Sequence, residues 1–283
     1  MNLIQILILA VIQGAAELLP VSSSAHVIMA EKLMGLDPTS PEMTFLLIML
    51  HTGTMIAVLG YFWPQWKAIF KSTRQERISF IQSLGVATAL TGIIGYALKF
   101  LIEKVFLRHQ IHAEIEQIFG NLLLIATSLA GVGSLIIWAG SKGRTEAPEA
   151  RLDQKRAGLI GAVQGLCMPF RGFSRSGATI STGLLLGIPR LQAEQFSFAL
   201  AVVLTPPLIV REAHRLLRDR GLGHEVEILH SLRPGLLGMV FSFLAGWLAL
   251  KWLSSWLERG KWSYFGYYCW AASLCVFLFY FST

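Results

Sequence analysis

The chain has 283 residues, of which 54% are hydrophobic and 14% are charged, and its formal net charge at pH 7 is +7. In a typical soluble domain about a quarter of the residues are charged, so this composition excludes an ordinary soluble protein and indicates a membrane protein. In a membrane protein, excess Lys and Arg are found in cytoplasmic loops and beside lipid headgroups. We therefore expect membrane lipids as partners and no nucleic acid.

The first segment, residues 3–34, consists of two short apolar pieces around the polar break "ELLPVSSSAH". Each piece is too short to cross a bilayer, because a spanning helix needs roughly 17 to 25 residues. We therefore expect a re-entrant hairpin that enters and leaves the membrane on the same side.

Three apolar stretches that follow are long enough to cross the membrane: 44–63, 81–101 and 117–140. The connection 64–80 contains four basic residues and one acidic residue, and 141–156 contains five basic residues, so both are placed inside. The connection 102–117 then falls outside, and counting crossings puts the first hairpin on the outer face.

The second half has the same order of segments. Residues 157–188 form another interrupted apolar pair around "MPFRGFSRSGATI", which predicts a second re-entrant hairpin on the inner face. Its crossings are predicted at 195–212, 234–252 and 264–281. The loop 211–233 between them falls outside and is interpreted as an amphipathic surface helix.

These segments predict one all-α polytopic membrane domain, 1–283, with six transmembrane helices and two re-entrant hairpins in an inverted-topology repeat. Repeat one is 1–141 and repeat two is 157–283, in opposite orientations because each has three crossings. "VIQGAAELLPVSSSAH" and "AVQGLCMPFRGFSRSG" share Gln-Gly, a Pro-containing stretch and Ser-x-Ser. In such architectures the broken segments meet near the midplane and form the site. A homodimer is left open.

The first hairpin carries the candidate catalytic groups. Of the 17 acidic residues, we place only Glu17 inside a membrane segment, where a charge costs roughly 2.5–3.5 kcal/mol and indicates function. Ser23 or His26 is the candidate nucleophile or acid–base group, and the sequence does not choose between them. His51, also in an apolar segment, is interpreted as a packing or supporting residue.

The second hairpin provides the basic partner for Glu17. Ser174 and Ser176 are natural N-caps of a helix that begins near Arg175, and Arg171 adds a further positive charge. A helix N-terminus with an adjacent guanidinium favours phosphate binding. The alternative is a capped helix start whose arginine pairs with Glu17 only structurally. The combination of both hairpins predicts phosphoryl transfer on a lipid-borne substrate in a membrane cavity.

Both polar breaks resemble motifs of the bacterial undecaprenyl-diphosphate phosphatase family, the bacitracin-resistance type. "QGAAELLPVSSSAH" is similar to its first motif, Glu-Gly-x-Thr-Glu-Phe-Leu-Pro-Val-Ser-Ser-Thr-Gly-His. "RGFSRSGAT" is similar to its second motif, Pro-Gly-x-Ser-Arg-Ser-Gly-x-Thr. "HTGTMIAVLGYFW" and "EQFSFALAVVLTPP" extend the likeness over nearly the whole chain.

The resemblance implies hydrolysis of undecaprenyl diphosphate to undecaprenyl phosphate and inorganic phosphate in the bacterial inner membrane. This reaction recycles the lipid carrier of cell-wall synthesis and confers bacitracin resistance. It also implies a divalent cation, Mg²⁺ or Ca²⁺, at Glu17. The catalytic residues expected from it are Glu17, Ser23, His26 and Arg175, and the expected substrate-binding residues include Ser22, Ser174, Ser176, Gly177 and Thr179. Gln13 and Arg171, which depart from the motifs, are also expected to bind the substrate.

Three departures of the chain from the first motif bear on the site. Gln13 stands where the family has its first glutamate, Ala16 replaces a threonine, and Ala25 replaces a glycine. Gln13 lies four residues before Glu17 on the same helix face, so one carboxylate remains where two are expected. This change should weaken a cation site.

The second motif departs at Arg171, which stands where the family has a proline and could partly replace the cation's charge. The loss of the first glutamate also leaves a second interpretation open. The chain would then be a catalytically weakened paralogue that acts as a polyprenyl-phosphate transporter or binding protein.

Overall fold

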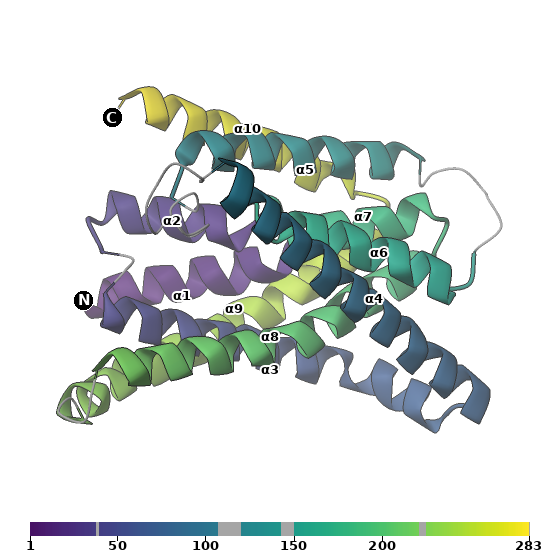
Figure 1. Ribbon diagram of the computed structural model, residues 1–283, viewed down its shortest axis with the longest axis horizontal. Helices are drawn as coiled ribbons and strands as arrows, with labels where there is room; N and C mark the ends of the chain where they lie inside the picture. Colours follow the sequence, from purple (N-terminus) through teal and green to yellow (C-terminus); the bar gives the residue numbers. More distant parts are fainter. Residues whose placement is uncertain (38–39, 107–119, 143–149, 221–224, 283) are drawn as a thin grey trace.

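The computed structural model of the protein describes residues 1–37, 40–106, 120–142, 150–220 and 225–282, in which every regular element is helical. In chain order these are α1 (Leu3–Leu18), α2 (Ser23–Leu33), α3 (Pro41–Lys71), α4 (Arg74–Leu101), η1 (Ile102–Phe106), α5 (Leu122–Lys142), α6 (Gln154–Cys167), α7 (Arg175–Leu185), α8 (Arg190–Arg220), α9 (Glu225–Glu258) and α10 (Ser263–Ser282). Figure 1 shows their arrangement.

Six of the described helices are long and apolar enough to cross a membrane: α3, α4, α5, α8, α9 and α10. They correspond to the six predicted crossings, although the start of 117–140 lies outside the described residues, so the chain is an all-helical, multi-pass membrane protein. The interpretation of 211–233 as a separate surface helix is wrong, because α8 continues to Arg220 and α9 already begins at Glu225. The residues between them, and most of the predicted outer connection 102–117, lie outside the described residues.

The four short helices form two pairs, α1 with α2 and α6 with α7, as the interrupted apolar segments predict. α1 stops before Pro20, which has no backbone N–H with which to continue a helix. Ser22 then has φ of 70°, a region that residues with a side chain rarely occupy. That each pair re-enters the membrane on one side stays a prediction.

The short helices pack tightly on long helices of the other half of the chain. α1 lies along α9 and α6 lies along α4, while α5 and α10 lie side by side at the top of Figure 1. A Cβ atom on Gly14 would come within 2.5 Å of the Ser242 carbonyl oxygen in α9, and one on Gly165 within 2.8 Å of the Thr91 carbonyl oxygen in α4. Glycine therefore permits both close approaches.

The main apolar core includes residues of the break between α1 and α2 and supports this break. Leu18, Leu19 and Val21 are buried there with Ile180 of α7 and Phe198 of α8. Close packing of this kind restricts the chain on both sides of the break. The polar side chains of the break are consequently held at fixed positions.

Candidate active site

The two polar breaks, about 150 residues apart in sequence, contact each other directly. Ser176 Oγ, at the start of α7, donates to the Leu19 carbonyl oxygen at 3.3 Å. The Gly172 N–H donates to Ser24 Oγ at 3.4 Å. These bonds hold the start of α7 against the start of α2.

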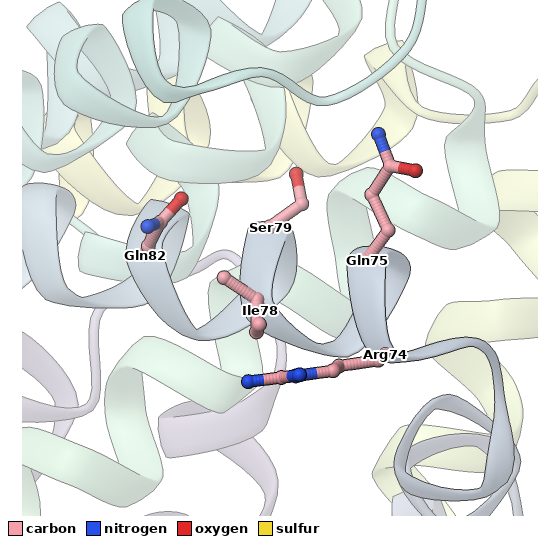
Figure 2. A pocket seen from close by; sticks show the side chains of 5 residues that line it. All are labelled: Arg74, Gln75, Ile78, Ser79 and Gln82. Carbon is pink, nitrogen blue, oxygen red and sulfur yellow. The ribbon is translucent and has the colours of Figure 1, made fainter.

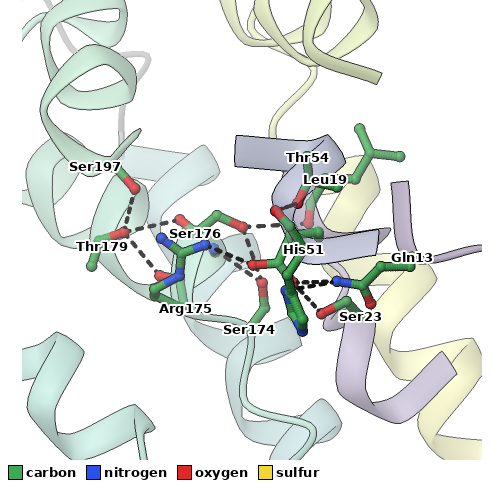
Figure 3. Close-up of polar contacts among 12 residues, drawn as sticks. Gln13, Leu19, Ser23, His51, Thr54, Ser174, Arg175, Ser176, Thr179 and Ser197 are labelled. Atoms are coloured by element: carbon green, nitrogen blue, oxygen red, sulfur yellow. Dashed lines mark hydrogen bonds and ion pairs between the residues drawn. The ribbon is translucent and has the colours of Figure 1, made fainter. Parts of the chain in front are cut away.

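Glu17 bonds three of the polar side chains that this contact brings together, Gln13, Ser23 and Arg175, which Figure 3 labels. Its Oε1 accepts a hydrogen bond from Arg175 Nη2 at 3.0 Å. Its Oε2 accepts from Ser23 Oγ at 2.6 Å and from Gln13 Nε2 at 3.2 Å. The side chains of Glu17 and Arg175 are 16% and 26% exposed, so this ion pair is largely shielded from solvent but can be reached.

Gln13 also connects Glu17 to His51, a residue of α3. Its Nε2 lies 3.1 Å from His51 Nδ1, which itself lies 3.9 Å from Glu17 Oε2. An amide N–H can only donate, so His51 Nδ1 accepts and the proton of the neutral ring is on Nε2. His51 therefore supports the site, one of the two interpretations that the sequence left open.

A small cavity lies beside the ion pair. It is lined by Glu17 and Arg175, by Thr54 and Thr205, and by apolar side chains of α3 and α8. A second, open pocket of about 520 Å³ is formed by Arg74 and four further residues of α4 (Figure 2). This second pocket contains none of the predicted site residues.

The Glu17 carboxylate thus contacts a serine of the first motif and the arginine of the second motif. In the comparison with known proteins, residues 6–275 match the family model described as "Bacitracin resistance protein BacA". The chain belongs to the BacA family.

Curated relatives of this BacA-family chain are named as diphosphatases. The chain is 56% identical over 277 residues to "Undecaprenyl-diphosphatase 2" of Acinetobacter baylyi, with 96% of each chain covered. It is 32% identical over 280 residues to the "Undecaprenyl-diphosphatase" of Thermodesulfovibrio yellowstonii, covering 99% of this chain and 98% of the relative. It is 30% identical to the enzyme of that name from Korarchaeum cryptofilum, covering 95% and 96%.

The hydrogen bonds of His26 are made with residues other than Glu17. Its Nδ1 lies 2.8 Å from the Ser22 carbonyl oxygen and its Nε2 lies 2.7 Å from the Tyr268 hydroxyl. Ser23 donates to Glu17. The side-chain contact of Ser23 is therefore with the Glu17 carboxylate and not with the His26 imidazole.

The predicted binding residues around Arg175 are mostly buried. Ser174 caps α7 by accepting from the Gly177 N–H at 3.2 Å. Thr179 is fully buried, and its hydroxyl bonds the Arg175 carbonyl oxygen at 2.8 Å and Ser197 Oγ at 2.6 Å. Ser174, Ser176 and Thr179 thus fix the start of α7 and the position of Arg175.

Two of the remaining predicted residues lie in the breaks themselves. Ser22 is buried, and its Oγ lies 3.2 Å from Ser24 Oγ. Arg171 is exposed in the break before α7, within electrostatic range of His51 and of Glu31 in α2. These two residues border the site on its α2 side.

The placement of Glu17 as the only acidic residue inside a membrane segment is wrong. Glu31 of α2 is 3% exposed and Glu194 of α8 is 1% exposed. Glu194 accepts from Ser254 Oγ at 2.6 Å, and Ser254 Oγ in turn accepts from the Tyr61 hydroxyl at 3.0 Å. Glu194 was missed because it lies one residue before the predicted crossing 195–212. The Lys that follows Glu31 made that end of the hairpin resemble a polar boundary.

Proposed function

We propose that this BacA-family protein hydrolyses undecaprenyl diphosphate to undecaprenyl phosphate and inorganic phosphate in the bacterial inner membrane. The relatives named as undecaprenyl-diphosphatases over nearly the whole chain support this activity. The single structural observation that carries it is the Glu17 carboxylate, which binds the Ser23 hydroxyl at 2.6 Å and the Arg175 guanidinium at 3.0 Å.

In the proposed reaction Ser23 is the nucleophile and Glu17 its base. Ser23 Oγ attacks the terminal phosphorus, its proton passes to Glu17, and the bond from that phosphorus to the bridging oxygen breaks. Undecaprenyl phosphate leaves and takes the proton from Glu17. Glu17 can then activate the water that releases inorganic phosphate from the phosphoserine and regenerates the Ser23 hydroxyl. The choice of Ser23 over His26 rests on the contact between Ser23 and Glu17.

Arg175 neutralises the phosphate oxygens in this proposal. A guanidinium can bind two phosphate oxygens at once, and it lies at the positive end of the α7 dipole. Charge that develops on the phosphate oxygens is stabilised by such fixed donors in a site of low dielectric. The buried hydroxyls around Arg175 hold this donor in place before substrate arrives.

A divalent cation fits the site only if the protein and the substrate both supply ligands to it. Among the described residues no group of three or more His, Cys, Asp or Glu could hold a metal ion. Mg²⁺, however, is commonly held by one or two carboxylates together with substrate phosphates. We propose that Glu17 and the diphosphate oxygens would hold Mg²⁺ or Ca²⁺ between them, and that the cation would supply positive charge to the phosphate.

The alternative of a lipid-phosphate transporter or binding protein without hydrolysis is not favoured. The curated relatives described above are named as diphosphatases, and the contact of Ser23 with the Glu17 carboxylate supplies the nucleophile and base that hydrolysis needs. Gln13 is compatible with hydrolysis because its amide donates to Glu17 and orients it.

Phosphate release from undecaprenyl diphosphate by the purified protein tests the proposal. Wild type should release phosphate, and Arg175→Ala should reduce kcat/KM by about a hundredfold or more, because phosphate charge loses its fixed donor. Arg259→Ala, which removes an exposed arginine after α9, is the matched control and should leave the rate unchanged. A wild type without activity, or an Arg175→Ala variant at the wild-type rate, would contradict the proposal.

A further inference from the structure

Tyr268 of α10 contacts the imidazole of His26, 242 positions earlier in the chain. The Tyr268 hydroxyl lies 2.7 Å from His26 Nε2. The two rings are nearly parallel, with 13° between their planes and 5.6 Å between their centroids. The last helix of the chain thus reaches the first polar break.

The other nitrogen of the ring settles the direction of this hydrogen bond. His26 Nδ1 lies 2.8 Å from the Ser22 carbonyl oxygen, which can only accept, so Nδ1 carries a proton. In the neutral imidazole, Nε2 then has the lone pair and accepts from the Tyr268 hydroxyl. If Nε2 gains a proton, the same hydroxyl can accept from it without any movement of the rings.

The helix that presents Tyr268 is fixed against the break. The neighbouring Cys269 is fully buried, and its Sγ donates to the Pro20 carbonyl oxygen at 3.4 Å. Ser273 Oγ, one turn further on, donates to the Ala126 carbonyl oxygen in α5 at 2.6 Å. The Tyr268 hydroxyl is therefore held at a set distance from the Ser22 carbonyl oxygen, with His26 between them.

We propose that Tyr268 is a positioning residue for diphosphate hydrolysis, which acts by holding His26 in one orientation. This inference rests on the proposed function. With Nε2 bonded to Tyr268, Nδ1 of His26 stays on the Ser22 carbonyl oxygen, and the peptide bond that leads into Ser23, the proposed nucleophile, is held in place. Tyr268 needs no contact with the substrate for this role.

The neighbouring Tyr267 provides a matched control. It belongs to the same helix and is 58% exposed, against 49% for Tyr268. Its ring packs edge-on against Tyr264, 6.4 Å between centroids. Tyr267→Phe therefore removes the same hydroxyl from the same helix without touching His26.

The test is a cycle of Tyr268→Phe, His26→Ala and the double variant, assayed for phosphate release. Tyr268→Phe keeps the stacked ring, so we expect kcat to fall about five- to tenfold with KM within about twofold, the effect of one lost hydrogen bond. In the His26→Ala background the same change should alter kcat by less than about twofold, because a residue that acts through His26 has nothing left to orient. Tyr267→Phe should match wild type.

Nitrogen NMR of ¹⁵N-histidine-labelled protein gives a readout that does not depend on turnover. The His26 signals, assigned by their loss in His26→Ala, should report protonation at Nδ1 in wild type, and the Nε2 signal should shift in Tyr268→Phe because Nε2 loses the hydrogen bond from the hydroxyl.

The outcomes separate the two proposals. Wild-type kcat in Tyr268→Phe, an equal loss in the His26→Ala background, or unchanged His26 signals would overturn the positioning role while leaving the hydrolase activity standing. A wild type that releases no phosphate would overturn the proposed function itself, and this inference with it.

Discussion

Glu17 accepts hydrogen bonds from three side chains, one each on α1, α2 and α7. The three side chains affect the charge of the Glu17 carboxylate in different ways. Arg175 neutralises it, Ser23 offers it a proton, and Gln13 donates an amide N–H. A carboxylate between membrane helices is costly unless it is paired in this way. Gln13 therefore stabilises the ionised form of Glu17 where a second carboxylate would repel it.

Replacing Gln13 by glutamate should strengthen cation binding at this site. A second carboxylate supplies another anionic oxygen ligand, so we expect Gln13→Glu to lower the Mg²⁺ concentration for half-maximal activity by about tenfold. The measurement is phosphate release against free Mg²⁺, with binding of the metal to the substrate-free protein followed by calorimetry. Gln154→Glu, which adds the same charge at an exposed position, should leave both curves unchanged, and identical curves for Gln13→Glu and wild type would refute the account of Gln13.

The pairing of Glu17 with Arg175 across 158 positions was predictable because each is an expensive charge in an apolar segment. The contact of His26 with Tyr268 was not, because no local pattern in α10 distinguishes one exposed tyrosine from the next. It depends on where Cys269 and Ser273 fix that helix. The choice between Ser23 and His26 as partner of Glu17 likewise needed side-chain geometry.

The break between α1 and α2 owes its shape to the backbone of Ser22 as well as to its side chain. A φ of 70° is unfavourable for any residue with a Cβ atom. It persists because Leu19 and Val21 are buried on one side and the Ser22 carbonyl oxygen accepts from His26 on the other. Backbone strain of this kind is common at functional sites.

Two variants of Ser22 separate the backbone from the hydroxyl. Ser22→Ala and Ser22→Gly both remove the hydrogen bond to Ser24, but only glycine adopts this φ without cost. We expect Ser22→Gly to be about 1 kcal/mol more stable than Ser22→Ala in unfolding measured in detergent. Equal stability of the two variants would show that the backbone at Ser22 is not strained.

The close contact of α1 with α9 depends on Gly14. Its α-hydrogen faces the Ser242 carbonyl oxygen, and Gly14→Ala places a methyl group 2.5 Å from that atom. We expect a loss of about 1–3 kcal/mol in stability, measured by thermal unfolding in detergent, because backbone atoms cannot move aside cheaply. Gly92→Ala, where no atom lies within 4 Å of the added methyl group, should lose nothing, and a tolerated Gly14→Ala would contradict this packing.

In the molecule as a whole, α1 packs on α9 and α6 packs on α4. In the predicted inverted repeat α1 would correspond to α6 and α9 to α4, so these two contacts would be equivalent. The number of crossings could be predicted from apolar length alone. The ends of the helices could not, since α8 and α9 extend well beyond their apolar stretches. The repeat and the orientation in the membrane stay predictions, carried by the distribution of Lys and Arg.

Labelling of single cysteines tests that orientation. In a background without Cys167, Cys269 and Cys275, an impermeant maleimide added to intact cells should label Gly120→Cys and leave Gln75→Cys unlabelled, because 64–80 is placed inside. Opening the cells should expose Gln75→Cys. The reverse pattern would invert the topology and place the first hairpin on the inner face.

The central claim is that Ser23, activated by Glu17, attacks the diphosphate. Its most direct test is phosphate release from undecaprenyl diphosphate by wild type and Ser23→Ala under identical conditions, with Ser134→Ala, an exposed serine of α5, as control. The account predicts activity in wild type and Ser134→Ala and a loss of about a thousandfold or more in Ser23→Ala. Release by Ser23→Ala at the wild-type rate would contradict it.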